Sequence, residues 1–269
     1  MKRKLLSNPV STEPGQLHSS PGAHIGARRE MSSAPAHPQR RLLLALIGQD
    51  GPDPTIDTLP AVDQWCIISV MISDRPETTP VHRQVEYLQH ALSQNPVAQR
   101  LLTVAADMGL PNWYFGAGGV AQSVWNLRHG FEAQEGIKDY DLVYFDARDL
   151  SAETEARLED EVTHRFADDS VVVDVKNEAR VHLWYAERFG RRLDPYTSTE
   201  DAIATWPTTA SSVGVRRDQE GFVVCAPFGL SDLLGMVARP NKAIVAQDVY
   251  EEKVSRWAAR WPKLRVIPW

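Results

Sequence analysis

The sequence predicts an α/β or α+β domain whose small mixed sheet is flanked by helices. Short apolar runs alternate with segments of helical spacing, which is the pattern of a sheet with helices packed against it. The alternation lacks the regular long rhythm of repeated β-α-β units, so a purely parallel sheet is not expected. A composition of 43% hydrophobic and 24% charged residues is that of a globular protein.

The first 80 residues differ in composition from the rest of the chain. Ser, Pro, Gly and His dominate up to Gln39, and such a segment buries too little apolar area to offset its chain entropy. Two apolar islands follow, 42–47 and 65–72, and each is either a strand or an unstructured segment. We therefore expect a low-complexity, disordered extension over residues 1–80 and a folded domain over residues 81–269.

Charge and cysteine content restrict the classes of partner. The net charge of −6 divides into +5 over residues 1–41 and −11 over the remainder, which disfavours nucleic acid as a partner of the folded part. The two cysteines, Cys66 and Cys225, lie far apart without metal spacing, which suits a reducing cytoplasm. No apolar run reaches the roughly 18 residues of a membrane span, so no membrane partner is expected. Nothing in the sequence sets the oligomeric state.

The folded part begins with two predicted helices, at about 81–93 and 96–108. Their apolar residues fall at helical spacing, Asn95-Pro96 interrupts them, and Gly109 ends the second. A short strand at 113–115, a glycine-rich turn at 116–119 and a helix from 120 to about 128 follow.

The rest of the chain continues the alternation. Ser151 is a predicted N-cap of a helix that runs to about Phe166 and carries two acids in its first turn. The β-branched run 170–175 predicts a buried strand. The remaining predictions are helices at 179–188, from 197–200 to before Pro207, at 231–237 and at 245–259, and a β-hairpin of 213–217 with 222–226.

Three acids are candidate metal ligands and catalytic residues. Asp139 and Asp141 open a strand, and residues two apart on a strand share one face. Two carboxylates on one face repel each other unless a cation or a proton lies between them, and Mg²⁺ is the usual cation where phosphates are bound. Asp174 lies within the next apolar strand, where a carboxylate needs a partner. If the two strands are neighbours, the three acids can hold two metal ions.

The glycine-rich turn is a candidate phosphate site. Gly116 and Gly118 let backbone N–H groups approach a ligand closely, and the following helix adds its positive end. Gly119 belongs to the same turn. Arg180 stands near Asp174 in the sequence and is a further candidate for phosphate contact, with an ion pair as the alternative.

These features together resemble the nucleotidyltransferase superfamily, and more closely a bacterial family of uncharacterised nucleotidyltransferase-like proteins. The resemblance covers roughly residues 82–269. It rests on FGAGGVAQSVWN (115–126), KDYDLVYFD (138–146), VKNEARVHLWY (175–185), YTSTEDAIATWPTTASSVGVR (196–216), APFGLSDLL (226–234) and ARPNKA (238–243).

The resemblance implies a fold, an activity and a set of site residues. Gly116 and Gly118 would form the phosphate turn, Asp139 and Asp141 would bind the metal, and Asp174 would be the third carboxylate. The implied activity is transfer of a nucleoside monophosphate from a nucleoside triphosphate to a hydroxyl acceptor. Mg²⁺ is the implied cofactor, with Mn²⁺ as an alternative. The acceptor and the base are not implied.

Three other interpretations stay open. The run 116–121 also matches a dinucleotide-binding fingerprint, with Asp146 as the acid that would bind the ribose. The same fold could instead bind a nucleotide or a partner without turnover. Finally, the acids could be structural, with Asp174 neutralised by Lys176, Arg180 or His182. The aromatic residues Trp184, Tyr185, Trp206 and Trp257 are expected to be core residues or to stack on a base.

Overall fold

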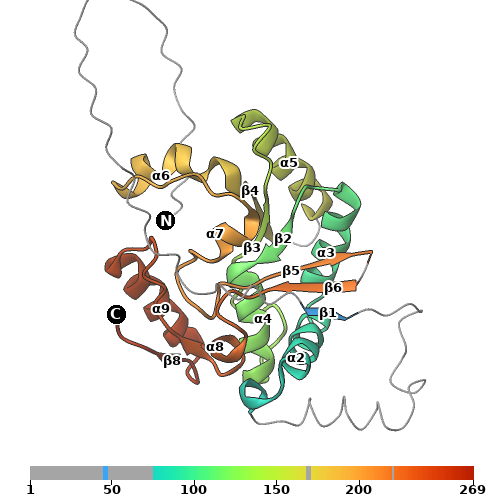
Figure 1. Ribbon diagram of the computed structural model, residues 1–269. Coiled ribbons are helices and arrows are strands. Elements are labelled where there is room, and N and C mark those ends of the chain that lie inside the picture. The colour runs from blue at the N-terminus through green and yellow to red at the C-terminus, as the bar shows by residue number, and fades with distance from the viewer. Residues whose placement is uncertain (1–44, 48–74, 168–170, 220) are drawn as a thin grey trace, which may run out of the picture. The chain divides into compact units, whose positions relative to one another are not determined.

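The computed structural model describes residues 45–47, 75–167, 171–219 and 221–269 (Figure 1). All of them belong to one compact unit, Gln39–Trp269. The predicted apolar island 65–72 and the segment 1–44 lie outside the described residues. None of the described helices is long and apolar enough to span a membrane.

The described strands form a mixed six-stranded sheet, which confirms the predicted fold class. Within this sheet only β3 (Asp139–Tyr144) and β4 (Val172–Asn177) pair in parallel, and the other neighbouring strands are antiparallel. Residues 45–47 of the first apolar island form a strand that pairs with the hairpin. In spatial order the strands are β1 (Ala45–Ile47), β6 (Gly221–Cys225), β5 (Gly214–Asp218), β2 (Tyr114–Gly116), β3 (Asp139–Tyr144) and β4 (Val172–Asn177).

One face of the sheet carries the main hydrophobic core. Phe115, Leu142 and Val175 point to this face and are fully buried. Helices α2 (Val81–Ser93), α3 (Pro96–Met108) and α4 (Ala117–His129) supply most of the apolar residues that cover it, and Figure 1 shows them grouped together. Helix α5 (Ala152–Arg165) adds Val162 beside strand β4. Because successive side chains of a strand point to opposite faces, burial of these residues places their neighbours in the sequence on the other face of the sheet.

The opposite face is only partly filled by apolar side chains. Tyr114, Val143, Val223 and Cys225 form a small buried cluster there, and Ile203 packs on it. The elements on this side follow β4 in the chain, and Figure 1 shows α6 and α7 there. They are the 3₁₀ turn η4 (Glu178–Arg180), α6 (Val181–Phe189) and α7 (Thr199–Ile203). Helix α9 (Gln247–Arg260) buries its apolar residues in the main core, with Trp257 against Trp125 of α4.

Most predicted elements are confirmed, with ends that differ by one to three residues. The prediction of a helix at 231–237 is wrong beyond its first turn: α8 (Ser231–Leu234) ends at Gly235. Val237–Ala238 instead forms strand β7, which pairs in parallel with β8 (Arg265–Val266). Met236, two residues past the helix, has a φ of +51°, outside the right-handed helical region, and a distant segment supplies the partner of the strand that follows.

Asn95 joins three elements of the core. Its side-chain oxygen accepts hydrogen bonds from the N–H groups of Val97 and Ala98 and so caps α3. Its Nδ2 donates to Ser123 Oγ on α4 at 2.9 Å and to the Tyr140 hydroxyl on β3 at 3.1 Å. Asn95 is fully buried, so the Tyr140 hydroxyl and the two capped N–H groups depend on it for their hydrogen bonds, whereas Ser123 Oγ also donates to the Gly119 carbonyl at 2.7 Å.

We expect Asn95→Ala to lower the free energy of unfolding by about 2–4 kcal/mol, because it removes a helix cap and the hydrogen-bond partner of the buried Tyr140 hydroxyl. Urea denaturation measures the loss. Ser151→Ala is the matched control, since Ser151 also caps a helix but is half-buried, and its loss is expected near 1 kcal/mol. Equal losses in the two variants would contradict this role of Asn95.

Candidate active site

Strand register brings the three predicted acids onto the same face of the sheet. β3 and β4 run in parallel with Asp141 directly opposite Asp174, and Asp139 lies two residues before Asp141. Side chains opposite each other on neighbouring strands point to the same side, as do residues two apart on one strand. The expectation that the strand of Asp174 lies beside the strand of Asp139 and Asp141 is confirmed.

Asp141 lies at the centre of this face. Burial, together with the nearby carboxylates of Asp139 and Asp174, raises the pKa of its carboxyl to about 7. Two groups act in the opposite direction: the Lys253 ammonium, and the backbone N–H of Gly118, which donates to the carboxylate. Asp141 therefore sits where negative charge is crowded and where added positive charge would be stabilised.

Lys253 of α9 is the cation that faces this charge. Burial lowers the pKa of its ammonium group, while Asp141 and Asp139 oppose that shift. Sequence reasoning missed this residue, because Lys253 reads as the polar side of an amphipathic helix more than 100 positions after Asp141. Only the tertiary packing of α9, with Trp257 against Trp125 of α4, reveals it.

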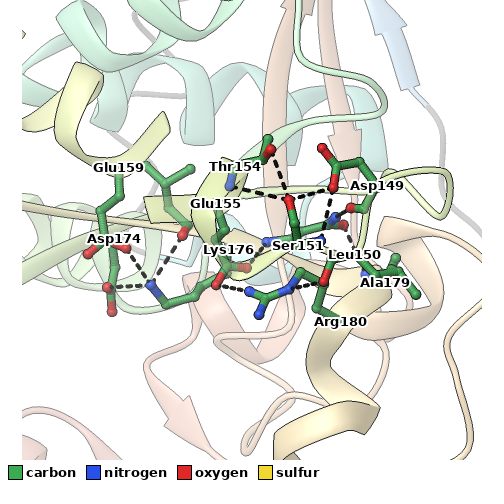
Figure 2. A network of polar contacts seen from close by, with 12 residues as sticks. Asp149, Leu150, Ser151, Thr154, Glu155, Glu159, Asp174, Lys176, Ala179 and Arg180 are labelled. Carbon is green, nitrogen blue, oxygen red and sulfur yellow. Dashed lines mark hydrogen bonds and ion pairs between the residues drawn. The ribbon is translucent and has the colours of Figure 1, made fainter. Parts of the chain in front are cut away.

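Asp174 forms an ion pair with Lys176, which lies on the same strand. Lys176 Nζ lies 3.1 Å from the Asp174 carboxylate and 2.7 Å from the Glu159 carboxylate of α5, and Figure 2 shows the ammonium between the two acids. The Asp174 side chain is 44% exposed. Among the described residues no group of three or more His, Cys, Asp or Glu converges as a metal site. The alternative that Lys176 neutralises Asp174 is thus realised in the structure.

Arg180 does not reach the carboxylates. Its guanidinium forms an ion pair with Glu155 of α5, and its Nε donates to the Leu150 carbonyl at 3.0 Å (Figure 2). The ion-pair alternative for Arg180 is the one the structure shows. Because the pair is largely buried, its structural role is to fasten η4 to the start of α5.

The glycine segment forms the junction of β2 and α4 rather than a separate turn. α4 begins at Ala117, so Gly118 and Gly119 lie in its first turn. The left-handed conformation belongs to Ala117, whose φ is +52° and whose N–H donates to the Val213 carbonyl. A non-glycine residue in this conformation stores strain, which folded proteins often keep at functional positions.

The three glycines meet different surroundings. A Cβ on Gly116 would lie 2.6 Å from the Trp206 ring, and one on Gly119 would lie 2.8 Å from Phe115, so packing requires both glycines. A Cβ on Gly118 would lie 2.8 Å from the Gln122 amide and 4.0 Å from the Asp141 carboxylate. Gly118 is therefore the one of the three that faces the acids.

The topology contradicts the dinucleotide interpretation. That fingerprint requires parallel strands on both sides of its helix, whereas β2 and β3 are antiparallel. Asp146, the acid expected to bind the ribose, instead accepts hydrogen bonds from the backbone and guanidinium of Arg148.

A cavity of about 660 Å³ opens beside Asp141. β3, β4 and η4 supply one wall, and α6, the segment around Trp206 and α9 supply the others. Its polar lining includes Asp141, Lys176, Lys253 and the buried Glu178. Its aromatic lining consists of Trp184, Tyr185, Phe189, Tyr196 and Trp206. This volume lies in the range of pockets that take small-molecule ligands.

Glu178 is a second site acid that sequence reasoning missed. Burial, together with the nearby acids Asp141 and Glu155, raises the pKa of its carboxyl to about 8. The side chain of Trp206 donates a hydrogen bond to it. In the sequence, Glu178 reads as an ordinary acid before a helix, so no local signal marks it.

Comparison with known proteins agrees with this arrangement. A family model described as nucleotidyltransferase matches residues 103–266, which is more than half of the chain. A solved NMR structure, described as revealing a CCA-adding enzyme head domain, is 27% identical with a TM-score of 0.57. The similarity covers 68% of this chain and 95% of that one. The search of curated proteins found no match.

We expect Glu178→Gln to become more stabilising as pH rises. The folded-state pKa of about 8 lies above the unfolded value of 4.5, so the wild type loses stability between these values, because the carboxyl ionises in the unfolded state but stays protonated in the folded state. Near pH 5 the variant and the wild type should unfold with similar free energies, and near pH 9 the variant should be more stable by about 2–4 kcal/mol.

Denaturant titration at a series of pH values measures this difference. Glu153→Gln is the matched control, because Glu153 is an exposed acid of α5 and its replacement should give a difference that does not change with pH. A Glu178→Gln difference that is constant from pH 5 to pH 9 would show that Glu178 is not a buried neutral acid.

Proposed function

Because the chain belongs to the nucleotidyltransferase family, we propose that it transfers a nucleoside monophosphate from a nucleoside triphosphate to a hydroxyl acceptor. The observation that carries the proposal is the register that places Asp139, Asp141 and Asp174 on one face. That face also holds the N-terminus of α4 and a cavity of nucleoside size.

Asp139 and Asp141 fit a Mg²⁺ ion. Mg²⁺ binds through one or two carboxylates and keeps water and phosphate oxygens as its other ligands, so this pair meets its needs. Together with burial, the negative charges of Asp139 and Asp174 raise the pKa of Asp141. Such an ion would neutralise these charges. Asp174 is proposed as the third carboxylate, and its ion pair with Lys176 competes with that role. Mn²⁺ is an alternative ion for the same ligands.

The ion, when bound, supplies neutralisation of phosphate charge, and the protein supplies positioning. The start of α4, with Gly118 in its first turn, offers the positive end of a helix to phosphate oxygens. Lys253 lies beside the carboxylates and adds a positive charge for the triphosphate.

In the proposed reaction the acceptor oxygen bonds to the α-phosphorus. The bond from that phosphorus to its bridging oxygen breaks, and pyrophosphate leaves. The hydroxyl proton passes to a neighbouring carboxylate. Asp174 suits this step because its side chain is half-exposed at the edge of the site, where an acceptor can approach.

Nucleotide binding without turnover is the second candidate function. The observation that favours it is the ion pair between Lys176 and Asp174, which occupies the third carboxylate. Pyrophosphate release across a panel of hydroxyl acceptors separates the two: release supports transfer, and tight nucleotide binding without release supports the second candidate.

We expect Asp139→Asn and Asp141→Asn each to weaken Mg²⁺-dependent binding of a nucleoside triphosphate at least tenfold, about 1.4 kcal/mol, because each removes a metal-binding charge. Calorimetry with ATP, CTP, GTP and UTP, with and without Mg²⁺, measures the change. Asp160→Asn, at an exposed position of α5, is the matched control. Unchanged Mg²⁺-dependent binding in both site variants would refute the metal site.

Asp174→Asn is expected to act on turnover more than on binding. Because Lys176 already neutralises Asp174, its loss should change nucleotide affinity by less than about threefold, against at least tenfold for Asp141→Asn. Pyrophosphate release should fall at least tenfold if Asp174 accepts the proton. A variant with full turnover would remove Asp174 from the proposed mechanism.

A further inference from the structure

Glu178 is placed to contact whatever occupies the cavity. It is 6% exposed, follows β4 directly and lines the cavity. The charged groups that act on it are Asp141 and Glu155, both acids, and Glu155 is already paired with Arg180. A buried carboxyl in such surroundings is costly to keep for packing alone, since an apolar side chain would fill the space without that cost.

Three other polar groups of the aromatic wall form hydrogen bonds within the protein. The Tyr185 hydroxyl donates to the Ile244 carbonyl at 2.8 Å, and the Tyr196 hydroxyl lies 2.6 Å from Thr205 Oγ1. The Trp206 side chain donates to Glu178. Because these groups already have partners within the protein, the rings present apolar surfaces to the cavity. Glu178 is the buried carboxyl among them.

The ring of Trp206 links this wall to the candidate phosphate site. It packs so closely on Gly116 that a Cβ there would lie 2.6 Å from the ring. Its loop is held by Asn241, whose Nδ2 donates to the Trp206 carbonyl at 2.9 Å and to the Ala204 carbonyl at 2.8 Å. A ligand that extends from Asp141 along this wall therefore meets a rigid aromatic surface and then Glu178.

We propose that the cavity binds the nucleobase of the nucleoside triphosphate and that Glu178 reads the hydrogen-bonding edge of that base. This inference rests on the proposed function, because it places the phosphates beside Asp141. A base stacked between apolar ring faces brings its edge to the carboxyl, which can pair with amino and ring N–H groups. Discrimination follows because a mismatched base would leave a buried polar group unpaired.

The test compares Glu178→Leu with Glu178→Gln in the full chain. Calorimetry with ATP, CTP, GTP and UTP ranks the four bases for each protein, and the four free nucleosides without Mg²⁺ serve as phosphate-free probes. Glu178→Leu should reduce the ratio between the best and the worst base at least tenfold, while Glu178→Gln keeps the wild-type order. Glu153→Leu, the same exchange at an exposed position of α5, should leave the ranking unchanged.

Several outcomes would overturn the inference. One is a wild type that binds all four bases equally well, and another is a Glu178→Leu variant that leaves the ranking of the bases unchanged. An equal loss of affinity for all four bases in Glu178→Leu would indicate a structural role. A changed preference for ribose over deoxyribose with an intact base ranking would place Glu178 at the sugar instead. If Glu178→Leu does not fold, Trp206→Phe replaces it in the test. This variant keeps an aromatic ring at position 206 but removes the N–H donor that orients Glu178, and it should weaken the base discrimination in the same way.

The design separates this inference from the proposed function. Base discrimination that depends on Glu178, together with nucleotide binding that is indifferent to Asp139 and Asp141, would refute the metal site and retain the base pocket. Mg²⁺-dependent binding that requires those acids, with a ranking indifferent to Glu178, would refute the base pocket alone.

Discussion

The parallel pairing of β3 and β4 is the constraint on which the site depends. It sets Asp141 against Asp174, with Asp139 on the same face, and so concentrates negative charge at one edge of the sheet. The surrounding elements supply groups that stabilise this negative charge. α4 gives the Gly118 N–H, α9 gives Lys253, and β4 itself gives Lys176. Without these groups the crowded carboxylates would destabilise the fold.

The aromatic cavity and the carboxylates are parts of one site because Trp206 belongs to both. Its ring covers Gly116 at the start of α4, and its side chain donates a hydrogen bond to Glu178 in the cavity wall. This arrangement explains why residue 116 is glycine: a side chain there would push the ring from its place. The glycines of the segment therefore serve packing at 116 and 119, and face the acids at 118.

Much of the fold follows from local patterns. The break at Asn95-Pro96, the cap at Ser151 and the paired apolar runs of the β5–β6 hairpin each depend on residues close in sequence, and the structure confirms them. The short strand β7 was mispredicted as helix, because its partner β8 lies almost 30 residues away and leaves no local trace. Nucleotidyltransferase-family membership was also accessible from motifs, since they record the order of the same elements.

The sequence by itself determined that Asp139 and Asp141 share one face of β3, because side chains alternate along a strand. Tertiary structure decided what surrounds them. Only the packing of α9 brings Lys253 to Asp141, and only the placement of α5 brings Glu159 to Lys176 and Glu155 to Arg180. Glu178 became a buried acid through α6 and the Trp206 segment closing over it. Burial and charge pairing arise between distant segments, so spacing along the chain could not predict them.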